Sequence, residues 1–487
     1  MGSLQKTAIS SIKWSTLQTI IVGLLGPISL LIKAKFLNPV EFGYLSIIMI
    51  TIGLFGTLEG FGISQAIIQK DTISKEESST IFIFNILSCI VFALILYFAS
   101  PFIAIFFKMS ELKDYLPIVS IIIFLHGPTL LMRAYFEKNL LFRQLSIIAI
   151  FRNLLITLVM TLFLILDFGV FSVIIGHLVG IIFVAVTFSI LAIRIKLFKI
   201  KLFFKLSALF PFLKFGIYVS GKGLLSFVTH RLDEIVIGYF LSQEILGFYH
   251  FGKNMLEKIR ILITNTYGKV LFPLFAKLKN NQNRLQKVYY QITSYIGFSA
   301  FPLFGGIAVT AHLFVPIVFG EIWKDSIIVF QVFSISTIFL VLTANIASSL
   351  LYSANRPKIV FYVEIVTSIL YFILILTIAS NGMLAILLTY FSYVILKTLA
   401  LQHFANSQLK TNLLFYFKQL VPQIITTVIM CIVILLLQHI TQNYIGELLL
   451  LVLSVLLGVG VYSTITWFYA SNIILELKSA VIKGRIT

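Results

Sequence analysis

Cysteine is nearly absent from this chain of 487 residues, which contains only Cys89 and Cys431. Both lie inside apolar stretches and are far apart in the sequence. Two isolated cysteines in such surroundings form neither a disulfide framework nor a set of thiolate ligands. We therefore expect no disulfide, no metal site and no bound cofactor.

Charged residues are also few, since Asp, Glu, Lys and Arg together make up 11% of the chain. The polar segments between apolar stretches are short, so no loop has room for a catalytic domain, and we predict that the protein is not an enzyme. A Gly-rich phosphate loop ending in Lys-Ser or Lys-Thr is missing, which argues against ATP-driven transport by this chain alone. The first residues, MGSLQKTAISSIKW, lack the cleavage site of a removable signal peptide.

Acidic residues are the scarcer charge, with 18 Asp and Glu against 37 Lys and Arg, a formal net charge of +19. A basic chain can indicate a nucleic-acid partner. Here the basic residues stand beside apolar stretches, and no basic nucleic-acid module is present. We interpret them as signals of membrane topology and expect no nucleic-acid partner.

Long apolar runs dominate the chain, which is 59% hydrophobic. A bilayer core about 30 Å thick needs roughly 20 apolar residues per helix, and the sequence provides such runs almost end to end. The alternating segments of a transmembrane β-barrel are absent. We predict an all-α polytopic membrane protein with about 14 transmembrane helices. The expected spans are 14–34, 44–68, 79–107, 115–136, 145–166, 170–193, 215–241, 247–276, 288–319, 327–353, 359–379, 383–404, 420–440 and 447–471.

The loops between these spans differ in charge. Segments 194–214 and 277–287 contain six and four basic residues and no acid, whereas 242–246 and 380–382 contain no Lys or Arg. Cytoplasmic loops of membrane proteins carry the excess of Lys and Arg. We therefore expect the two basic loops and both termini on the cytoplasmic side.

An internal repeat is visible in two pairs of segments. FLNPVEFGYL (36–45) matches FLSQEILGFY (240–249) at an offset of 204 residues, and FIAIFF (102–107) matches FVPIVF (314–319) at an offset of 212. The members of each pair are six expected spans apart, so the two halves have parallel orientation. Transporters built from such repeats bind substrate where the halves meet.

This repeat predicts two halves of six spans each, followed by two further spans. The predicted division is an N-terminal lobe (1–193), a basic cytoplasmic linker (194–214), a C-terminal lobe (215–404) and a last part with two spans and a cytoplasmic tail (405–487).

Ionisable residues follow one face of the span at 215–241. At about 100° per residue, its polar side chains form a stripe at spacings i, i+4, i+7 and i+11. Arg231 points away from this stripe and stands three residues before Glu234, a spacing that allows an ion pair. The stripe consists of Lys222, Ser226, Thr229 and Asp233.

The next span carries a second stripe. It contains Lys253, Glu257, Arg260 and Thr264, and Arg260 lies near the middle of the span. Ion pairs that fix helix register are one interpretation of both stripes. Lining of a cavity is the other, and we favour it because the basic residues outnumber the acidic ones. A basic cavity indicates an anionic guest, and the planar guanidinium group of arginine suits phosphate.

Other ionisable residues stand inside or at the edges of spans. Glu59 lies near the middle of the second span. Long side chains nearer the ends of their spans are expected to reach the interface with water. That group consists of Arg133, Arg152, Glu364 and Lys397.

Three segments resemble one known family of exporters: residues 33–69, residues 230–255 and LLYSANRPK at 350–358. They look like polysaccharide-repeat flippases of the Wzx or colanic-acid-exporter type. That family belongs to the MATE-like superfamily of multidrug, oligosaccharidyl-lipid and polysaccharide exporters. The resemblance implies two six-helix lobes around a central cavity, two extra C-terminal helices and a location in the bacterial cytoplasmic membrane.

The resemblance also implies a substrate and a mechanism. The substrate is an undecaprenyl-pyrophosphate-linked oligosaccharide, moved across the membrane by alternating access driven by an ion gradient. Lys222, Lys253 and Arg260 would then hold the diphosphate, with Ser226, Thr229 and Thr264 beside them. Asp233, Glu257 and Glu59 would exchange the coupling ion, H⁺ or Na⁺. Membrane lipids and other membrane proteins of polysaccharide assembly are the partners expected beside the lipid-linked substrate.

Two alternatives share this fold. A lipid II flippase would handle the same lipid diphosphate with a different glycan, and the sequence does not separate it from the first interpretation. A multidrug antiporter takes organic cations, which favour an acidic cavity, so the basic excess argues against it.

Overall fold

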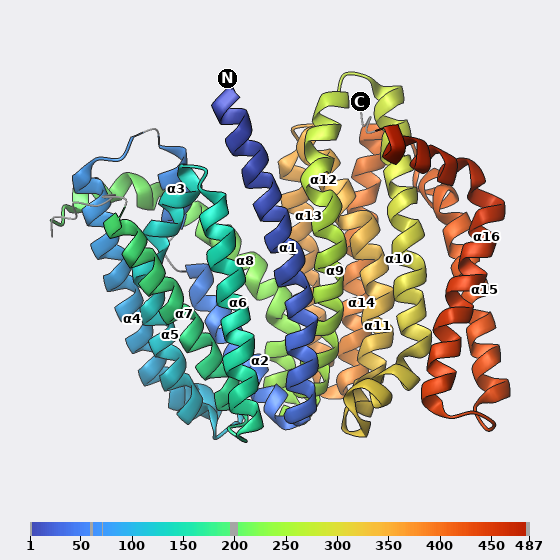
Figure 1. Cartoon of the computed structure of the whole chain (residues 1–487), viewed down its shortest axis with the longest axis horizontal. Coiled ribbons are helices and arrows are strands. Elements are labelled where there is room, and N and C mark those ends of the chain that lie inside the picture. The colour runs from blue at the N-terminus through green and yellow to red at the C-terminus, as the bar shows by residue number, and fades with distance from the viewer. Residues whose placement is uncertain (1, 59–61, 71, 195–202, 484–487) are drawn as a thin grey trace. The chain divides into compact units, whose positions relative to one another are not determined.

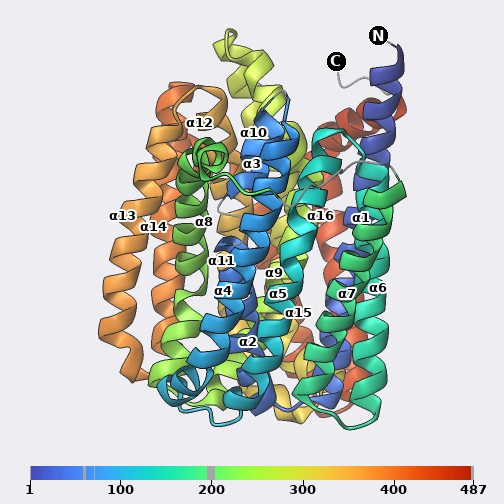
Figure 2. The same ribbon diagram turned by 90° about the vertical axis from the view of Figure 1, so that its left-hand side faces the viewer.

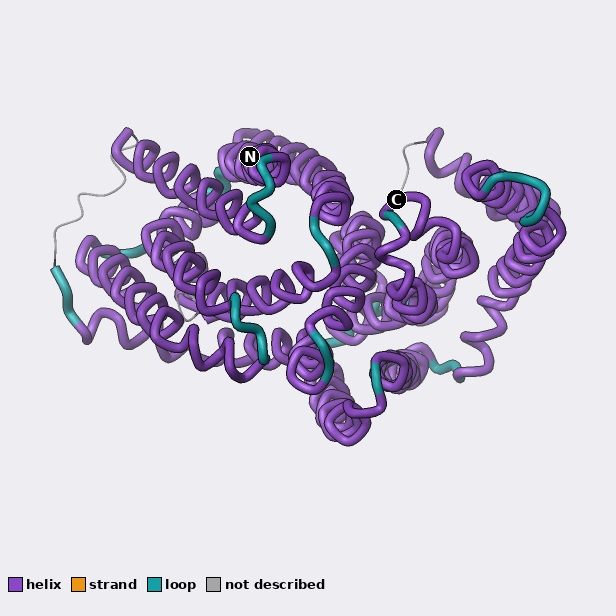
Figure 3. Tube along the Cα trace, turned by 90° about the horizontal axis from the view of Figure 1, so that it is seen from below, coloured by secondary structure: helices purple, strands orange, loops and turns teal. Residues whose placement is uncertain are grey.

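The computed structural model describes residues 2–58, 62–70, 72–194 and 203–483, which form helices joined by short loops (Figure 3). The helices are α1 (Gly2–Phe36), α2 (Pro39–Leu58), α3 (Ile63–Gln69), α4 (Lys75–Phe107), α5 (Leu112–Lys138), α6 (Phe142–Ile165), α7 (Val170–Arg194), α8 (Leu206–Phe240), α9 (Gln243–Leu278), α10 (Gln282–Phe319), η2 (Glu321–Ser326), α11 (Ile327–Phe339), η3 (Leu340–Ala344), α12 (Asn345–Ser353), α13 (Pro357–Ile378), η4 (Ala379–Asn381), α14 (Met383–Leu409), α15 (Leu413–Thr441) and α16 (Glu447–Lys483).

The all-helical membrane fold is confirmed, but the predicted number of 14 spans is not. Within the described ranges, 12 segments are long and apolar enough to cross a membrane. Helices α8 and α9, which the sequence interpretation counts as spans, are 35 and 36 residues long. They are not among the 12, and they are the two helices whose expected spans carry the charged stripes.

The chain forms two compact units, unit 1 (Met1–Phe251) and unit 2 (Gly252–Thr487). Their boundary falls inside α9 and therefore differs from the predicted lobe boundary at residues 194–214. The reason is that α8 packs against α2, α3 and α4 within unit 1. Part of the predicted linker, residues 195–202, lies outside the described chain, and its last part forms the start of α8.

Unit 1 is built from long helices packed along their lengths. Helix α4 lies beside α5, and α6 lies beside α7 and α1 (Figures 1 and 2). A buried cluster that includes Ile63, Ile81, Leu131 and Phe212 joins α3, α4, α5 and α8. Large apolar side chains elsewhere, such as Ile105, are exposed. Such exposure fits helices that face hydrocarbon, where each backbone polar group is bonded within its own helix.

Unit 2 contains α10 to α16 and the rest of α9. Helix α10 packs against α11, α15 and α16, and α13 packs against α14. Met430, Ile434 and Tyr462 form a small core between α15 and α16. The π-helical segment η3 interrupts the run from α11 to α12.

The repeat offset of 204 residues reappears in the helix boundaries. Helices α1 and α8 both have 35 residues and end at Phe36 and Phe240, so 240 − 36 = 204. Helices α2 and α9 begin at Pro39 and Gln243, so 243 − 39 = 204. The two repeated segments therefore have the same helix–turn–helix form.

Two equivalent glycines allow these repeated segments to touch within unit 1. A Cβ atom on Gly43 would lie 2.1 Å from the carbonyl oxygen of Gln243, and one on Gly247 would lie 1.7 Å from that of Pro39. Positions 39 and 243 correspond in the repeat, as do 43 and 247. The contact therefore has the reciprocal form of a two-fold interface, and only glycine permits so close an approach.

Candidate functional site

A cavity of about 420 Å³ lies within unit 1. Its size is in the range of small-molecule binding pockets. Most of its polar lining comes from α3, α5, α6 and α8. The lining residues are Gly56, Thr57, Gly62, Ser64, Gln65, His126, Thr129, Leu130, Arg133, Glu137, Arg152, Ile181, Val184, Phe188, Ser220 and Gly223.

Helix α5 provides a continuous polar wall for this cavity. His126, Thr129, Arg133 and Glu137 follow one another at spacings of three and four residues, which places them on one face of the helix. The 11 residue steps from His126 to Glu137 span about 16 Å of helix. Glu137 stands in the last turn of α5 and His126 near its middle. The cavity therefore extends from the end of the helix to about half its length.

The charged side chains of the cavity are two arginines and one glutamate. Arg133 Nε donates to Glu137 Oε1 at 2.9 Å, so these two charges offset each other. Arg152, from α6, adds a second guanidinium group. Hydroxyl and amide groups of Ser64, Gln65 and other residues complete the lining. This combination can bind an anionic group with the arginines and sugar hydroxyls with the neutral polar side chains.

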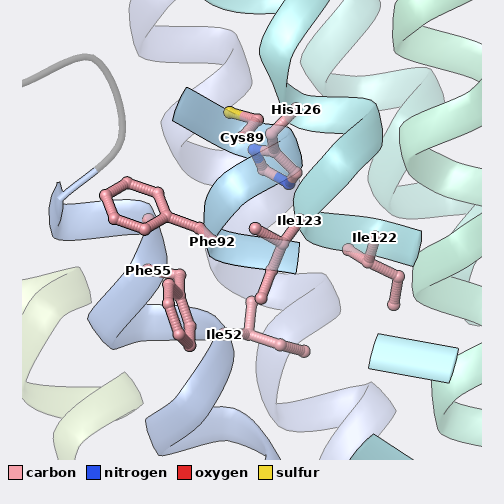
Figure 4. Close-up of a pocket in the computed structure, with 8 residues that line it drawn as sticks. Ile52, Phe55, Cys89, Phe92, Ile122, Ile123 and His126 are labelled. Carbon is pink, nitrogen blue, oxygen red and sulfur yellow. The ribbon is translucent and has the colours of Figure 1, made fainter. Parts of the chain in front are cut away.

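An apolar crevice adjoins the polar cavity at Gly56 and His126, which line both (Figure 4). Its volume of about 10 Å³ is roughly that of one water molecule. The rings of Phe55 and Phe92 lie 5.6 Å apart on one side of it. His126 therefore stands where the polar cavity of unit 1 ends and the apolar packing begins. The crevice is lined by Ile52, Phe55, Gly56, Cys89, Phe92, Ile122, Ile123 and His126.

A second group of polar side chains lies near the opposite end of unit 1 and is almost completely buried. Glu234, which is 0% exposed, is its centre. Its Oε1 accepts from Arg231 Nη1 at 2.7 Å. Its Oε2 lies 2.7 Å from Ser46 Oγ and 2.6 Å from His250 Nδ1. The ion pair that the spacing of Arg231 and Glu234 allows is therefore present.

Asp233 belongs to the same group. Its side chain accepts from the hydroxyl of Tyr249 at 2.6 Å and from the backbone N–H of Glu234 at 2.9 Å. Both Asp233 and Tyr249 are at most 1% exposed. We call Ser46, Arg231, Asp233, Glu234, Tyr249 and His250 the buried cluster.

Comparison with known proteins identifies the family. Residues 32–328 match the model of the family described as "Polysaccharide biosynthesis protein", which is more than half of the chain. The chain belongs to this polysaccharide biosynthesis protein family.

Two relatives of this family member match it over most of their length. The lipopolysaccharide biosynthesis protein WzxC of Escherichia coli (strain K12) is 26% identical over 76% of this chain and 74% of its own. The teichuronic acid biosynthesis protein TuaB of Bacillus subtilis (strain 168) is 26% identical over 89% of both chains. Both names place the family in the synthesis of surface polysaccharides.

The fold is also that of a solved flippase. The lipid II flippase MurJ in an inward closed conformation superimposes with a TM-score of 0.77, over 95% of this chain and 100% of that chain. At 17% sequence identity, this similarity shows a shared fold alone. The protein is thus a multi-pass membrane protein that shares the helical fold of this structure.

The predicted stripe on α8 has a mixed environment in this family member. The side chain of Lys222, like the whole of Glu59, lies outside the described part of the structure. Ser226 is exposed, and the hydroxyl of Thr229 donates to the carbonyl of Leu225 at 2.9 Å. Asp233 is in the buried cluster and not on a hydrated face.

The predicted stripe on α9 lies in unit 2. Lys253 is only 6% exposed. Glu257 and Arg260 form a long ion pair of 3.4 Å, and the hydroxyl of Thr264 donates to the carbonyl of Ile261 at 3.3 Å. Among the described side chains, none of these predicted binding residues lines the cavity of unit 1, so their role stays a prediction.

The sequence interpretation underestimates Arg133 and Arg152. It expects both to reach the membrane interface, but both line the cavity. The spacing of His126, Thr129, Arg133 and Glu137 forms a polar stripe on α5, a signal that could have found Arg133. Arg152 lies on α6, outside that stripe.

Lys397 also differs from its expected position at the membrane interface. Its side chain is 10% exposed, and its Nζ lies 2.7 Å from Glu364 Oε2, which fixes α14 to α13 in unit 2. The nearby hydroxyl of Tyr393 lies 3.2 Å from the same Nζ.

Proposed function

We propose that this protein is a flippase for undecaprenyl-pyrophosphate-linked oligosaccharide repeat units in the synthesis of a bacterial surface polysaccharide. It would move each unit from the cytoplasmic to the outer leaflet of the cytoplasmic membrane. Family membership and the names of the relatives support polysaccharide export. The observation that carries the proposal is the polar cavity of unit 1, whose lining includes Arg133 and Arg152.

The cavity fits the head of such a substrate. A diphosphate and a glycan cannot lie in hydrocarbon without a large desolvation cost, whereas a polyprenyl chain can. Arg152 and Arg133 would hold the diphosphate, because one guanidinium group can donate two parallel hydrogen bonds to two phosphate oxygens. Ser64, Gln65 and Thr129 would bond to sugar hydroxyls. Transport of this kind needs no covalent chemistry by the protein.

The sidedness of the cavity follows from the basic loops. The last turn of α5 contains Lys138 and the first turn of α6 contains Arg143, and the basic segment 194–214 begins at the last residue of α7. By the positive-inside rule, the C-terminal ends of α5 and α7 and both termini of the chain would lie on the cytoplasmic side. The cavity would therefore receive the substrate from the side where lipid-linked repeat units are made.

The predicted stripes remain part of this proposal. Lys222, Lys253 and Arg260 would give the diphosphate further contacts along its path, beside Ser226, Thr229 and Thr264. Asp233, Glu257 and Glu59 are candidates for exchange of a coupling H⁺ or Na⁺. Lipids and other membrane proteins of polysaccharide assembly would be the partners.

The deciding experiment is deletion of the gene in its host, followed by analysis of the lipid-linked intermediates. We expect undecaprenyl-diphosphate oligosaccharides to accumulate and surface polymer to be lost, with growth retained. Arrest of growth with accumulated lipid II would instead indicate a lipid II flippase. Increased sensitivity to cationic drugs with normal polymer would indicate a multidrug antiporter.

Complementation with variants then tests the cavity. Arg152→Ala should reduce export about 10- to 100-fold at equal protein abundance, since a hydrogen bond to a charged group contributes about 1.5–3 kcal/mol. Arg284→Ala is the matched control, because Arg284 is exposed at the start of α10 in unit 2. Full export by Arg152→Ala would exclude this cavity from the substrate path.

A further inference from the structure

One wall of the polar cavity comes from helices that carry neither of its arginines. Arg152 belongs to α6, which packs against α1, α5 and α7, whereas α8 packs against α2, α3 and α4. We call the lining residues of α2 and α8 the α2–α8 wall. They are Gly56, Thr57, Ser220 and Gly223. The substrate contacts proposed above include none of them.

Ser220 is the first residue of this wall that the packing does not explain. It lines the cavity and is 8% exposed. Its hydroxyl has no hydrogen-bond partner among the residues that the structure describes. A hydroxyl in a helix can bond to a carbonyl three or four residues earlier, as those of Thr57 and Thr129 do in this cavity. The hydrogen on Ser220 Oγ is therefore available to a ligand.

Gly56 is the second such residue. Three of the described lining residues are glycines, and two of them have structural reasons. Gly62 has a left-handed backbone with a φ of 67°, and a Cβ on Gly223 would lie 3.2 Å from Thr57 Cγ2. Gly56 lies within α2, and a Cβ there would meet no described atom within 4 Å. Since glycine weakens a helix relative to alanine, what it provides at position 56 is empty space.

This empty space adjoins the apolar crevice, because Gly56 lines the crevice as well as the cavity. Two phenylalanines and three isoleucines make most of the crevice apolar (Figure 4). Its volume of about 10 Å³ admits one small group. Such a group should be apolar, because cavities with apolar walls stay dry. A methyl group on a polar ligand therefore fits the place where the cavity and the crevice meet.

From this geometry, we infer that the α2–α8 wall and the crevice form a subsite that selects a sugar carrying a methyl group. Ser220 would donate a hydrogen bond to an oxygen of the sugar, and Gly56 would let the methyl group enter the crevice. Acetamido sugars and 6-deoxy sugars both carry such a group beside polar atoms. The inference rests on the proposed function and specifies the sugar that is bonded to the diphosphate.

The test measures binding to the full chain, purified in detergent, by isothermal calorimetry. Inorganic pyrophosphate probes the arginines without a sugar. Farnesyl diphosphate linked to glucose, to N-acetylglucosamine or to 6-deoxyglucose adds the sugar, and the last two each differ from glucose at one carbon. We expect one of these two to bind about fourfold more tightly than the glucose probe, as burial of one methyl group predicts. The tighter probe identifies the substituent.

Gly56→Ala places a methyl group of the protein at the entrance to the crevice. It should abolish the fourfold preference and leave the affinity for the glucose probe and for pyrophosphate within twofold. The variant should fold normally, because the new Cβ meets no described atom within 4 Å. Gly460→Ala, in α16, is the matched control, since a Cβ there meets no described atom either. It should keep the preference.

Ser220→Ala removes the hydroxyl that has no partner among the described residues. The three sugar probes should bind about two- to tenfold more weakly, the effect of one hydrogen bond, and pyrophosphate should stay within twofold. The thermal unfolding temperature should not fall, because no described hydrogen bond within the protein is lost. A merely structural role for Ser220 would instead lower that temperature and weaken all four probes alike.

The outcomes separate this subsite from the proposed function. Equal affinity for the three sugar probes, or a preference that survives Gly56→Ala, would overturn the subsite. Equal weakening of pyrophosphate and the sugar probes by Ser220→Ala would also overturn it. In each of these cases, binding of pyrophosphate by the wild type would still support the proposed function. If the wild type binds none of the four probes, both the proposed function and the subsite fail.

Discussion

The cavity and the buried cluster are two regions of unit 1 that place charge inside an apolar bundle in opposite ways. In the cavity, the side chains of Arg133 and Glu137 are 72% and 28% exposed. In the cluster, the side chains of Glu234 and His250 are 0% and 7% exposed. The charges of the cavity keep water as an alternative partner, whereas those of the cluster depend on one another.

This difference has an energetic consequence. A partly hydrated ion pair contributes about 0–1 kcal/mol, because water replaces the lost partner. Removal of one member of a buried pair costs several kcal/mol, because the remaining charge has no such replacement. Variants of the cavity should therefore change transport with little effect on stability, while variants of the cluster should change both. The four predictions that follow test this contrast in order of decreasing effect.

Glu234→Ala should have the largest effect on stability. It leaves the Arg231 guanidinium, 24% exposed, beside a dry space, and the expected loss is about 3 kcal/mol. The measurement is thermal unfolding of the purified protein in detergent. Glu137→Ala, in the cavity, should lose less than about 1 kcal/mol. Equal losses in the two variants would contradict the contrast between the regions.

Gly247→Ala should also destabilise the protein. Gly247 is close in sequence to Tyr249 and His250 of the buried cluster but does not belong to the cluster. The new Cβ would lie 1.7 Å from the carbonyl oxygen of Pro39, so α2 and α9 must separate. We expect a loss of about 2–3 kcal/mol from overpacking. Gly43→Ala, its equivalent in the repeat, should behave alike. Gly460→Ala is the control, since a Cβ there meets nothing within 4 Å.

Arg152→Lys should show the opposite profile in the cavity. Lysine keeps the positive charge but lacks the planar pair of donors, so export should fall about tenfold. The thermal unfolding temperature should change by less than 2 °C, roughly the shift that a few tenths of a kcal/mol produce. A stability loss as large as that of Glu234→Ala would place Arg152 among the structural charges.

Glu137→Gln should have the smallest effect, and it should be a gain. The change frees Arg133 from its ion pair and raises the positive charge of the cavity. Binding of inorganic pyrophosphate, followed by isothermal calorimetry, should tighten by no more than about fivefold. Weaker binding would indicate that Glu137 positions Arg133 for the anion instead of competing with it.

The sequence is sufficient for the parts of this protein that depend on local composition. Apolar runs predict helices that cross the membrane, because each such helix must satisfy its own backbone hydrogen bonds. The repeated segments at 36–45 and 240–249 predict the matching ends of α1, α2, α8 and α9. The spacing of Arg231 and Glu234 likewise allows their ion pair.

The sequence also predicts which side chains lie on the same face of a helix, but it does not predict what that face contacts. A polar stripe in the sequence shows which side chains share one face of a helix. From the stripe that contains Asp233, the sequence interpretation predicts that this face lines a cavity. The tertiary structure instead turns Asp233 toward the hydroxyl of Tyr249 in a dry cluster. The sequence interpretation assigns Arg133 to the membrane interface, whereas Arg133 lines the polar cavity together with other polar residues of α5.

The physical reason is that burial depends on neighbours from distant parts of the chain. The sequence alone determined a helical membrane protein with an internal repeat. Only the packing of α2, α3, α6 and α7 against α5 decided that Arg133 and Arg152 share a cavity. Only the contact of Ser46 and His250 with Glu234 decided which charges are kept from water.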